Sequence, residues 1–295
     1  MPLPSTDTVV LYPLGADNPE SLSAMATVLH VQPYDADHEL VLLDRTPAHP
    51  VDVAWPDQGP DRGTILVGER EQPLADVLLG ATNGTELYVG ANVPVRRGTE
   101  GWAFVVVHVL AEPSRIAVGD RVNVTVDDGH RRSLSVCHSL CHLASLALNA
   151  ALTDRWSKQA REDALGHPDF DHEAIQSSTI VPNGSVDVFR LNKSLRRKGF
   201  ATDGLPEALD DLQGTVTTSL REWVATDAAV HVEREGDGLS APRFWVCDLP
   251  EGTARIACGG THVSSLGELG EVSVSLTTGD DAGTATLTMR CEAAG

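Results

Sequence analysis

Two histidines and a cysteine–histidine pair have the residue types and spacing of metal ligands. His138 and His142 are four residues apart in a segment with helical periodicity, so both imidazoles project from one helix face and can bind the same ion. About 120 residues later, Cys258 and His262 flank two glycines, whose conformational freedom permits a sharp turn that brings thiolate and imidazole together. Either pair alone is a weak signal in a chain with 11 histidines.

Together the four side chains form a donor set of three nitrogens and one sulfur. Zn²⁺ binds such borderline-soft sets tetrahedrally, whereas calcium and magnesium prefer oxygen ligands. We therefore expect a zinc site. Cys137 and Cys141, also four residues apart and next to the histidines, are alternative ligands.

The N-terminal part of the chain, which precedes the first histidine pair, is predicted to consist of short strands. From Thr8 to about Leu110, apolar segments alternate with turns rich in Pro, Gly and Asp, a pattern typical of a small β barrel or sandwich. Residues 121–126 read as a further strand, followed by a turn at 127–129.

The C-terminal part combines helices with strands. Apolar residues recur every three and four positions from about Ser133 to Thr153, which predicts a mostly buried helix. A second helix is predicted from Pro206 to Val224, and five strand-like segments follow it. This order of elements favours helices packed on a mostly antiparallel sheet.

Composition and charge restrict the possible partners. The chain has 295 residues, enough for two domains, and a formal charge of −20, which argues against a polybasic membrane binder or a protein that coats DNA. Five cysteines at irregular spacing do not resemble a secreted disulfide framework, and we see neither a membrane span nor a signal peptide. We expect a cytoplasmic protein.

The metal-ligand motifs and several further segments resemble the editing domain of alanyl-tRNA synthetases and its freestanding AlaX-type relatives. His138-Ser-Leu-Cys-His142 and Cys258-Gly-Gly-Thr-His262-Val are similar to the H-x-x-x-H and C-x-x-x-H pair of that family. Other matches follow the family's order along most of the chain: Leu43-Asp44-Arg-Thr46, Asp61-Arg-Gly63-Thr-Ile65, Val126-Asp127 before Arg131, and Gln176-Ser-Ser-Thr179-Ile-Val.

The resemblance implies an architecture and an activity. It implies an α+β protein with a β-barrel-like N-terminal domain over residues 1–115 and a zinc-containing α+β editing domain over residues 116–295. The family hydrolyses the ester of a wrongly attached amino acid on tRNA. No adenylate-forming module fits in this length, so we expect a trans-acting aminoacyl-tRNA deacylase. Its oligomeric state stays open.

Departures from the family pattern leave the substrate open. The family's Thr after the first ligand is Ser139, and Ser178 and Thr179 replace its Gly and Ser. The family's three glycines are replaced by a longer segment at residues 51–57. The resemblance to the family implies seryl- or glycyl-tRNA(Ala) as the substrate. The altered segment at residues 51–57, Ser139 and Thr179 give equal weight to a threonine analogue such as fluorothreonyl-tRNA.

Three residues are candidate catalytic groups. By the resemblance, Gln176 and Thr179 lie near the editing pocket, where an amide and a hydroxyl can position water or the substrate side chain; alternatively Thr179 is a strand residue without such a role. His130 is a candidate general acid or base, since histidine is the residue type most often used for that role, or alternatively it is a solvated loop residue. Four protein ligands close a tetrahedron, so we favour zinc as an orienter of the substrate over zinc as an activator of water.

Two charged segments are further candidates. Five bases and no acid lie within the nine residues from Arg190 to Lys198, which predicts an electrostatic contact with tRNA or, alternatively, a solvated helix face. These bases are Arg190, Lys193, Arg196, Arg197 and Lys198. Asp169, Asp171 and His172 could form an acid–base or metal cluster, but without a family match we favour a charged surface loop.

Two other functions are compatible with the residues. One is a non-catalytic interaction protein in which zinc joins helix to sheet, since a four-ligand site is typical of structural zinc. The other is a metal-dependent hydrolase of a small ester or amide.

Overall fold

The structure is a computed structural model that describes residues 3–15, 18–52 and 56–294. The chain divides into two compact units. The first comprises Met1–Arg132, Val232–Phe244 and Ala257–Thr261, and the second comprises Ser133–His231, Trp245–Ile256 and His262–Gly295. Helices and mostly antiparallel sheets are both present, which confirms the expected α+β class.

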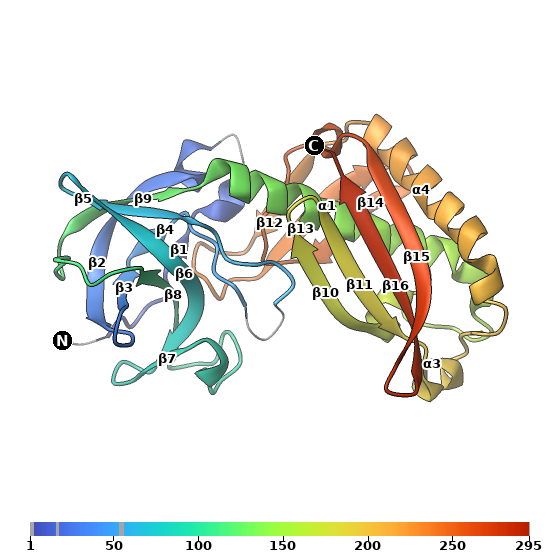
Figure 1. The fold of residues 1–295 in the computed structure, drawn as a ribbon, viewed down its shortest axis with the longest axis horizontal. Helices are drawn as coiled ribbons and strands as arrows, with labels where there is room; N and C mark the ends of the chain where they lie inside the picture. Colours follow the sequence, from blue (N-terminus) through green and yellow to red (C-terminus); the bar gives the residue numbers. More distant parts are fainter. Residues whose placement is uncertain (1–2, 16–17, 53–55, 295) are drawn as a thin grey trace. The chain divides into compact units, whose positions relative to one another are not determined.

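The first unit contains a seven-stranded sheet (Figure 1). Its strands, in sheet order, are β5 (Gly63–Val67), β9 (Arg121–Val126), β2 (Ser23–Pro33), β3 (Glu39–Leu43), β8 (Ala103–Leu110), β6 (Arg70–Thr82) and β7 (Leu87–Val89). Strand β5 also pairs with β6. A parallel pair, β1 (Val9–Val10) and β4 (Arg45–Thr46), adds a second, small sheet. The expected barrel-like form and the boundary at residues 115 and 116 stay predictions.

The two faces of β3 and β8 contribute to two separate apolar clusters. Every residue of β8 is buried, and so are four of the five residues of β3. Because successive side chains point to opposite faces, Val41 and Val106 join one cluster while Leu42 and Val107 join the other. Continuous apolar runs in these strands therefore reflect burial on both faces.

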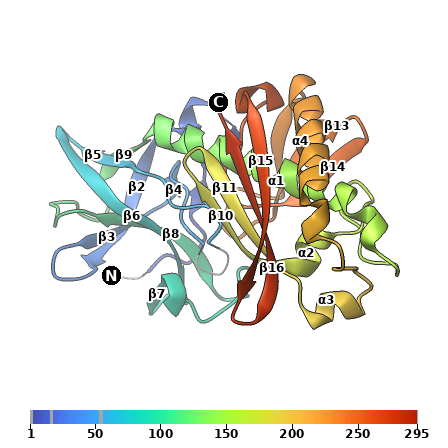
Figure 2. The ribbon, with the colours of Figure 1, turned by 45° about the vertical axis from the view of Figure 1, so that its right-hand side comes forward.

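The second unit is built on a four-stranded antiparallel sheet. Its strands, in sheet order, are β10 (Ile175–Val181), β11 (Gly184–Arg190), β16 (Thr284–Ala293) and β15 (Val272–Asp281). Figure 2 shows these strands side by side, with α4 (Leu209–Ala225) packed against β15. In β15 the buried Val272, Val274 and Leu276 alternate with exposed residues, so one sheet face packs on the helices.

The long helix α1 (Asp128–Ala151) begins five residues before the start expected from periodicity. The turn expected at residues 127–129 is wrong, because Asp127 caps the helix instead. Its Oδ1 accepts a hydrogen bond from the His130 backbone N–H at 3.0 Å, and its carbonyl accepts one from the Arg131 N–H at 2.9 Å. His130 consequently lies in the first helical turn.

Helix α1 is also long and apolar enough to cross a membrane by length and composition alone. However, 78% of its most apolar stretch is buried inside the structure, which is typical of a core helix. No other helix in the described ranges has this length and composition.

Shorter elements complete the fold. A three-stranded sheet has the order β12 (Val230–Arg234), β13 (Arg243–Leu249) and β14 (Gly252–Ala257). The remaining helices are α2 (Phe170–Ala174) and α3 (Lys193–Arg197), with 3₁₀ turns η1 (Tyr12–Leu14), η2 (Pro19–Ser21), η3 (Gly90–Asn92), η4 (Thr153–Arg155), η5 (Pro206–Ala208) and η6 (Leu266–Leu269). The expected helix at 206–224 is therefore a 3₁₀ turn followed by α4.

The buried His108 of the first unit generates a testable pH dependence. Burial lowers its pKa to about 4, although the Val41 carbonyl acts in the opposite direction. An unfolded histidine titrates near pH 6.5, so below that pH the unfolded state binds a proton that the folded state does not, and stability is lost as pH falls from 6.5 towards 4. The unfolding free energy of wild type minus that of His108→Gln should fall by about 3 kcal/mol between pH 6.5 and pH 4. Urea unfolding of both proteins at pH 7, 5.5 and 4 measures this difference. A difference that does not change with pH would contradict the lowered pKa of His108.

Candidate metal centre

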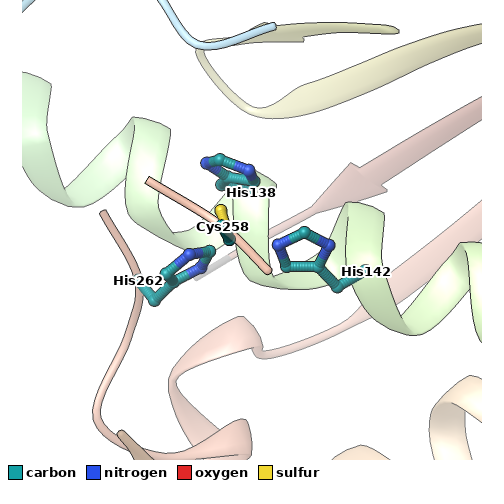
Figure 3. Close-up of side chains that lie close together, drawn as sticks. All are labelled: His138, His142, Cys258 and His262. Atoms are coloured by element: carbon teal, nitrogen blue, oxygen red, sulfur yellow. The ribbon is translucent and has the colours of Figure 1, made fainter. Parts of the chain in front are cut away.

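Four side chains converge to form a group that can hold a metal ion. His138 and His142 come from successive turns of α1, Cys258 directly follows β14, and His262 lies four residues further on. One ligand atom from each residue lies within 4.8 Å of the others. Figure 3 shows the three imidazoles and the thiol gathered at one place. The structure thus brings together all four residues expected as ligands.

The imidazole rings stand close to one another and to an aromatic side chain. The centroid of the His138 ring lies 4.9 Å from that of His142 and 4.6 Å from that of His262. The Trp245 ring lies 5.2 Å from the His142 ring and is fully buried. His138 is buried and His142 and Cys258 are half-buried, so the group is partly shielded from solvent and charges there interact more strongly than they do in solution.

The Cys258 thiol is held by its own turn. The Cys258 backbone N–H donates to the Arg243 carbonyl at 3.0 Å, and the Gly260 N–H donates to the Cys258 sulfur at 3.4 Å. Burial raises the pKa of this thiol to about 12; the Gly260 hydrogen bond and the charge of Arg243 act against that rise, while Asp57 adds to it. Because a metal ion binds the thiolate, binding must release a proton.

Buried hydrogen bonds surround His262. The Ser139 hydroxyl oxygen lies 3.2 Å from His262 Nδ1 and accepts a hydrogen bond from the Val263 N–H at 3.2 Å. The carboxamide of Gln58 bonds twice to Thr261: its Nε2 donates to the hydroxyl at 2.9 Å, and its Oε1 accepts from the backbone N–H at 3.0 Å. No role was expected for Gln58, since nothing in its sequence neighbourhood indicates a partner 203 residues away.

A buried ion pair anchors the beginning of α1. The Arg131 guanidinium forms a two-point contact with the Asp61 carboxylate, with Nε donating to Oδ1 at 2.8 Å and a second bond from Nη2 to Oδ2. Nη2 also donates to the Pro47 carbonyl at 2.8 Å and Nη1 to the Ser21 carbonyl at 3.2 Å. The Asp61 side chain is completely buried and that of Arg131 is 8% exposed. Both residues belong to the segments that resemble the family.

Removal of this guanidinium should be costly. Arg131→Ala leaves the Asp61 charge buried without its partner, so the unfolding free energy should fall by about 3–5 kcal/mol. Arg62→Ala, at the exposed position next to Asp61, is the control and should change it by less than about 0.5 kcal/mol. Denaturant unfolding followed by circular dichroism measures both. An equal effect of the two substitutions would show that the ion pair does not anchor the helix.

The three candidate catalytic residues are not members of the four-residue group. Gln176 lies at an irregularity at the start of β10, where its Oε1 accepts from Arg190 Nε at 2.8 Å and its Nε2 donates to Asp281 at 2.9 Å. Thr179 is exposed, on the face of β10 opposite to Ser178. His130 Nε2 lies 3.2 Å from the Pro60 carbonyl oxygen.

The alternative ligands Cys137 and Cys141 are also outside the group. Cys141 is buried, and its sulfur lies 3.6 Å from both carboxylate oxygens of Asp187 and 3.7 Å from the Ser178 hydroxyl. Burial, together with the negative charge of Asp187, raises the pKa of the Cys141 thiol well above its usual value. The thiol therefore serves as a hydrogen-bond donor here.

All five bases of the expected tRNA contact are exposed. They lie at the end of β11, along α3 and directly after it. Lys198 forms an ion pair with Glu173, and Arg196 donates to the Leu191 carbonyl at 3.0 Å. For Lys193 and Arg197 no side-chain partner occurs among the described residues.

The acidic segment at residues 169–172 is not simply a charged surface loop. Asp169 is buried and caps α2, where its side chain accepts from the His172 N–H at 3.1 Å, so the surface-loop interpretation is wrong for this residue. Burial raises the pKa of Asp171 to about 7, and the charges of Asp187 and Asp169 add to the rise. The longer segment at residues 51–57, expected to affect the substrate, includes residues 53–55, which lie outside the described ranges.

Comparison with known proteins extends these observations. No family model matches the sequence. The alanine–tRNA ligase of Frankia alni is 30% identical over 179 residues, which are 60% of this chain and 18% of the ligase. The alanine–tRNA ligase of Thermobifida fusca is 27% identical over 81% of this chain and 22% of its own length. The chain therefore spans about a fifth of the length of these ligases.

A shorter relative matches over most of its own length. The alanyl-tRNA editing protein AlaX-M of Pyrococcus horikoshii is 25% identical over 232 residues, which are 79% of this chain and 77% of that protein. The expected resemblance is thereby confirmed, and the chain is a homologue of the AlaX-type editing proteins and of part of the alanine–tRNA ligases.

Proposed function

We propose that the protein is a trans-acting aminoacyl-tRNA deacylase that uses Zn²⁺ and hydrolyses the ester of a mischarged or unusual aminoacyl-tRNA. The observation that carries the proposal is the convergence of His138, His142, Cys258 and His262 in a homologue of an alanyl-tRNA editing protein. The match to AlaX-M over 77% of that protein's length supports an editing protein.

The donor set fits zinc. Three imidazoles and one thiol, with ligand atoms within 4.8 Å of one another, match the nitrogen and sulfur ligands of tetrahedral zinc and offer no oxygen for calcium or magnesium. When bound there, zinc would supply a Lewis acid that orients the substrate's amino and carbonyl groups. We favour this orienting role over activation of water; with four protein ligands, either role needs a fifth coordination position or the displacement of one ligand.

The chain's own residues have three tasks in this reaction. The buried Trp245 packs beside His142 and is proposed to shield that side of the group from solvent. Gln176 and Thr179 are proposed to position the attacking water or the substrate side chain with an amide and a hydroxyl. His130 is proposed to exchange a proton at Nε2, where it now bonds to the Pro60 carbonyl. An ester is labile, so positioning supplies much of the required rate.

Two substrate classes follow from the residues. Similarity to alanine–tRNA ligases and AlaX-M supports seryl- or glycyl-tRNA(Ala). The altered segment at residues 51–57 and the departures at Ser139 and Thr179 support a threonine analogue such as fluorothreonyl-tRNA. The ratio of the kcat/KM values for two competing substrates measures the specificity of a site. The relative rates of hydrolysis therefore decide between the two substrate classes.

A panel of charged tRNAs tests the activity. Purified chain is incubated with alanyl-, seryl-, glycyl-, threonyl- and fluorothreonyl-tRNA, and ester loss is followed with and without a zinc chelator. At least one ester should disappear well above its spontaneous rate, and chelation, Cys258→Ala or His142→Ala should return it to that rate. Cys247→Ala replaces a buried cysteine outside the group and should retain activity.

Other outcomes identify the alternatives. A chain that binds zinc but speeds the hydrolysis of none of these esters would overturn the proposed enzyme function. It would support a non-catalytic protein stabilised by zinc, for which a closed set of four ligands is typical. Equal hydrolysis of free aminoacyl esters without tRNA would indicate a metal-dependent hydrolase of small esters.

We also propose that the five exposed bases between Arg190 and Lys198 contact the tRNA backbone. Lys193→Glu together with Arg197→Glu removes two cations without disturbing a side-chain hydrogen bond among the described residues. KM for charged tRNA should rise about tenfold and its salt dependence should weaken, while kcat and the KM for a minimal aminoacyl-adenosine stay unchanged. Arg70→Glu, at an exposed position of β6, is the control. Equal effects on both substrates would indicate misfolding instead of a lost contact.

Three coarser proposals complete this picture. The pairing of β5 with both β9 and β6 supports a barrel-like closure of the seven-stranded sheet. Residues 1–115 are proposed to form the N-terminal domain and residues 116–295 the editing domain. The protein is proposed to act in the cytoplasm, where aminoacyl-tRNA is used.

A further inference from the structure

We propose that Ser139 and Gln58 are positioning residues for the metal ligand His262. The inference deepens the metal site on which the proposed function rests. Neither residue belongs to the four-ligand group, but each bonds to the segment that carries His262. Ser139 and Gln58 are 0% and 1% exposed, so solvent has little access to their side of these bonds.

Ser139 fixes the orientation of the His262 ring. Its hydroxyl lies 3.2 Å from Nδ1. If Nδ1–H donates to this hydroxyl, Nε2 keeps its lone pair and can bind a metal ion. If Nδ1 instead accepts from the hydroxyl, the proton of the neutral ring lies on Nε2 and blocks coordination there. The same oxygen accepts from the Val263 N–H at 3.2 Å, so one side chain holds both the ring and the backbone beside it.

Gln58 fixes the residue on the other side of His262. The two bonds of its carboxamide to Thr261 use both the hydroxyl and the backbone N–H of that residue. Thr261 is 3% exposed, so an amide left without these partners would be costly. The backbone N–H groups of Thr261 and Val263 are thus both bonded to side chains.

The local sequence explains why such support is needed. Gly259 and Gly260 lie between Cys258 and Thr261 and provide the sharp turn, but glycines do not restrict the backbone by themselves. Without fixed neighbours, ordering His262 at the metal would cost conformational entropy on every binding event. Residues that orient a metal ligand in this way raise metal affinity by about 10–100-fold.

Zinc affinity tests Ser139 without any tRNA. The full chain and its variants compete for Zn²⁺ with a chromophoric chelator, and Co²⁺-loaded protein is examined by visible absorption. Ser139→Ala should weaken zinc binding by about 10–100-fold and alter the Co²⁺ bands, whereas Ser139→Thr keeps the hydroxyl and should restore both. Ser133→Ala is the matched control on the same helix, because no hydrogen-bond partner of its hydroxyl occurs among the described residues.

A second set of variants tests Gln58. Gln58→Ala and Thr261→Val should each weaken zinc binding, while Thr261→Ser retains the hydroxyl and should bind zinc like wild type. Circular dichroism and denaturant unfolding of every variant show whether it is folded. A folded variant with weaker zinc binding has lost the orientation of the ligand and not the fold. A Ser139→Ala variant with wild-type zinc affinity and Co²⁺ spectrum, or a Gln58→Ala variant with wild-type zinc affinity, would overturn the role of that residue.

These outcomes separate the positioning role from the enzyme function. If the variants lose zinc affinity but wild type hydrolyses no aminoacyl-tRNA, the positioning role stands and the deacylase proposal fails. If wild type binds neither Zn²⁺ nor Co²⁺, the positioning role itself is wrong.

Discussion

The candidate site depends on one geometric constraint: side chains from a regular helix must meet side chains from an irregular turn. Residues four apart in a helix rise about 6 Å along its axis, so His138 and His142 lie on one face but cannot enclose an ion by themselves. The remaining ligands come from a five-residue segment that begins where β14 ends. The ligand atoms lie within 4.8 Å of one another, and Gly259 and Gly260 give the turn a backbone freedom that the helix lacks.

The elements that carry ligands could be predicted because their signals are local. The helical spacing of His138 and His142 and the glycine turn before His262 each follow from a few adjacent residues. The helix start could not be predicted from periodicity, because Asp127 and its neighbours are polar and the first turn is fixed by a cap. The residues around the ligands could not be predicted either. Gln58 meets Thr261 across 203 residues, and no local pattern records such a pairing.

Strand geometry also explains why one expected residue lies where it does. In β10 the register shifts between Ile175 and Ser177, so the face on which each later side chain lies depends on an irregularity invisible in the sequence. Ser178 consequently faces Cys141 of α1, and its neighbour Thr179 points to the opposite, exposed face. A role for Thr179 in the reaction therefore requires a substrate that reaches this outer face.

Adjacent residues of α1 serve two chemically different environments. Successive helical residues are rotated by about 100°, so Cys141 and His142 cannot face the same partner. His142 joins three donors that suit a cation, whereas Cys141 meets the buried carboxylate of Asp187. Near Asp187, burial and like charge raise the pKa of Cys141 and of Asp171 and so favour their protonated forms. Cys141 is directed to Asp187 and lies outside the four-residue group, so α1 presents its histidine pair, and not this cysteine, to the group.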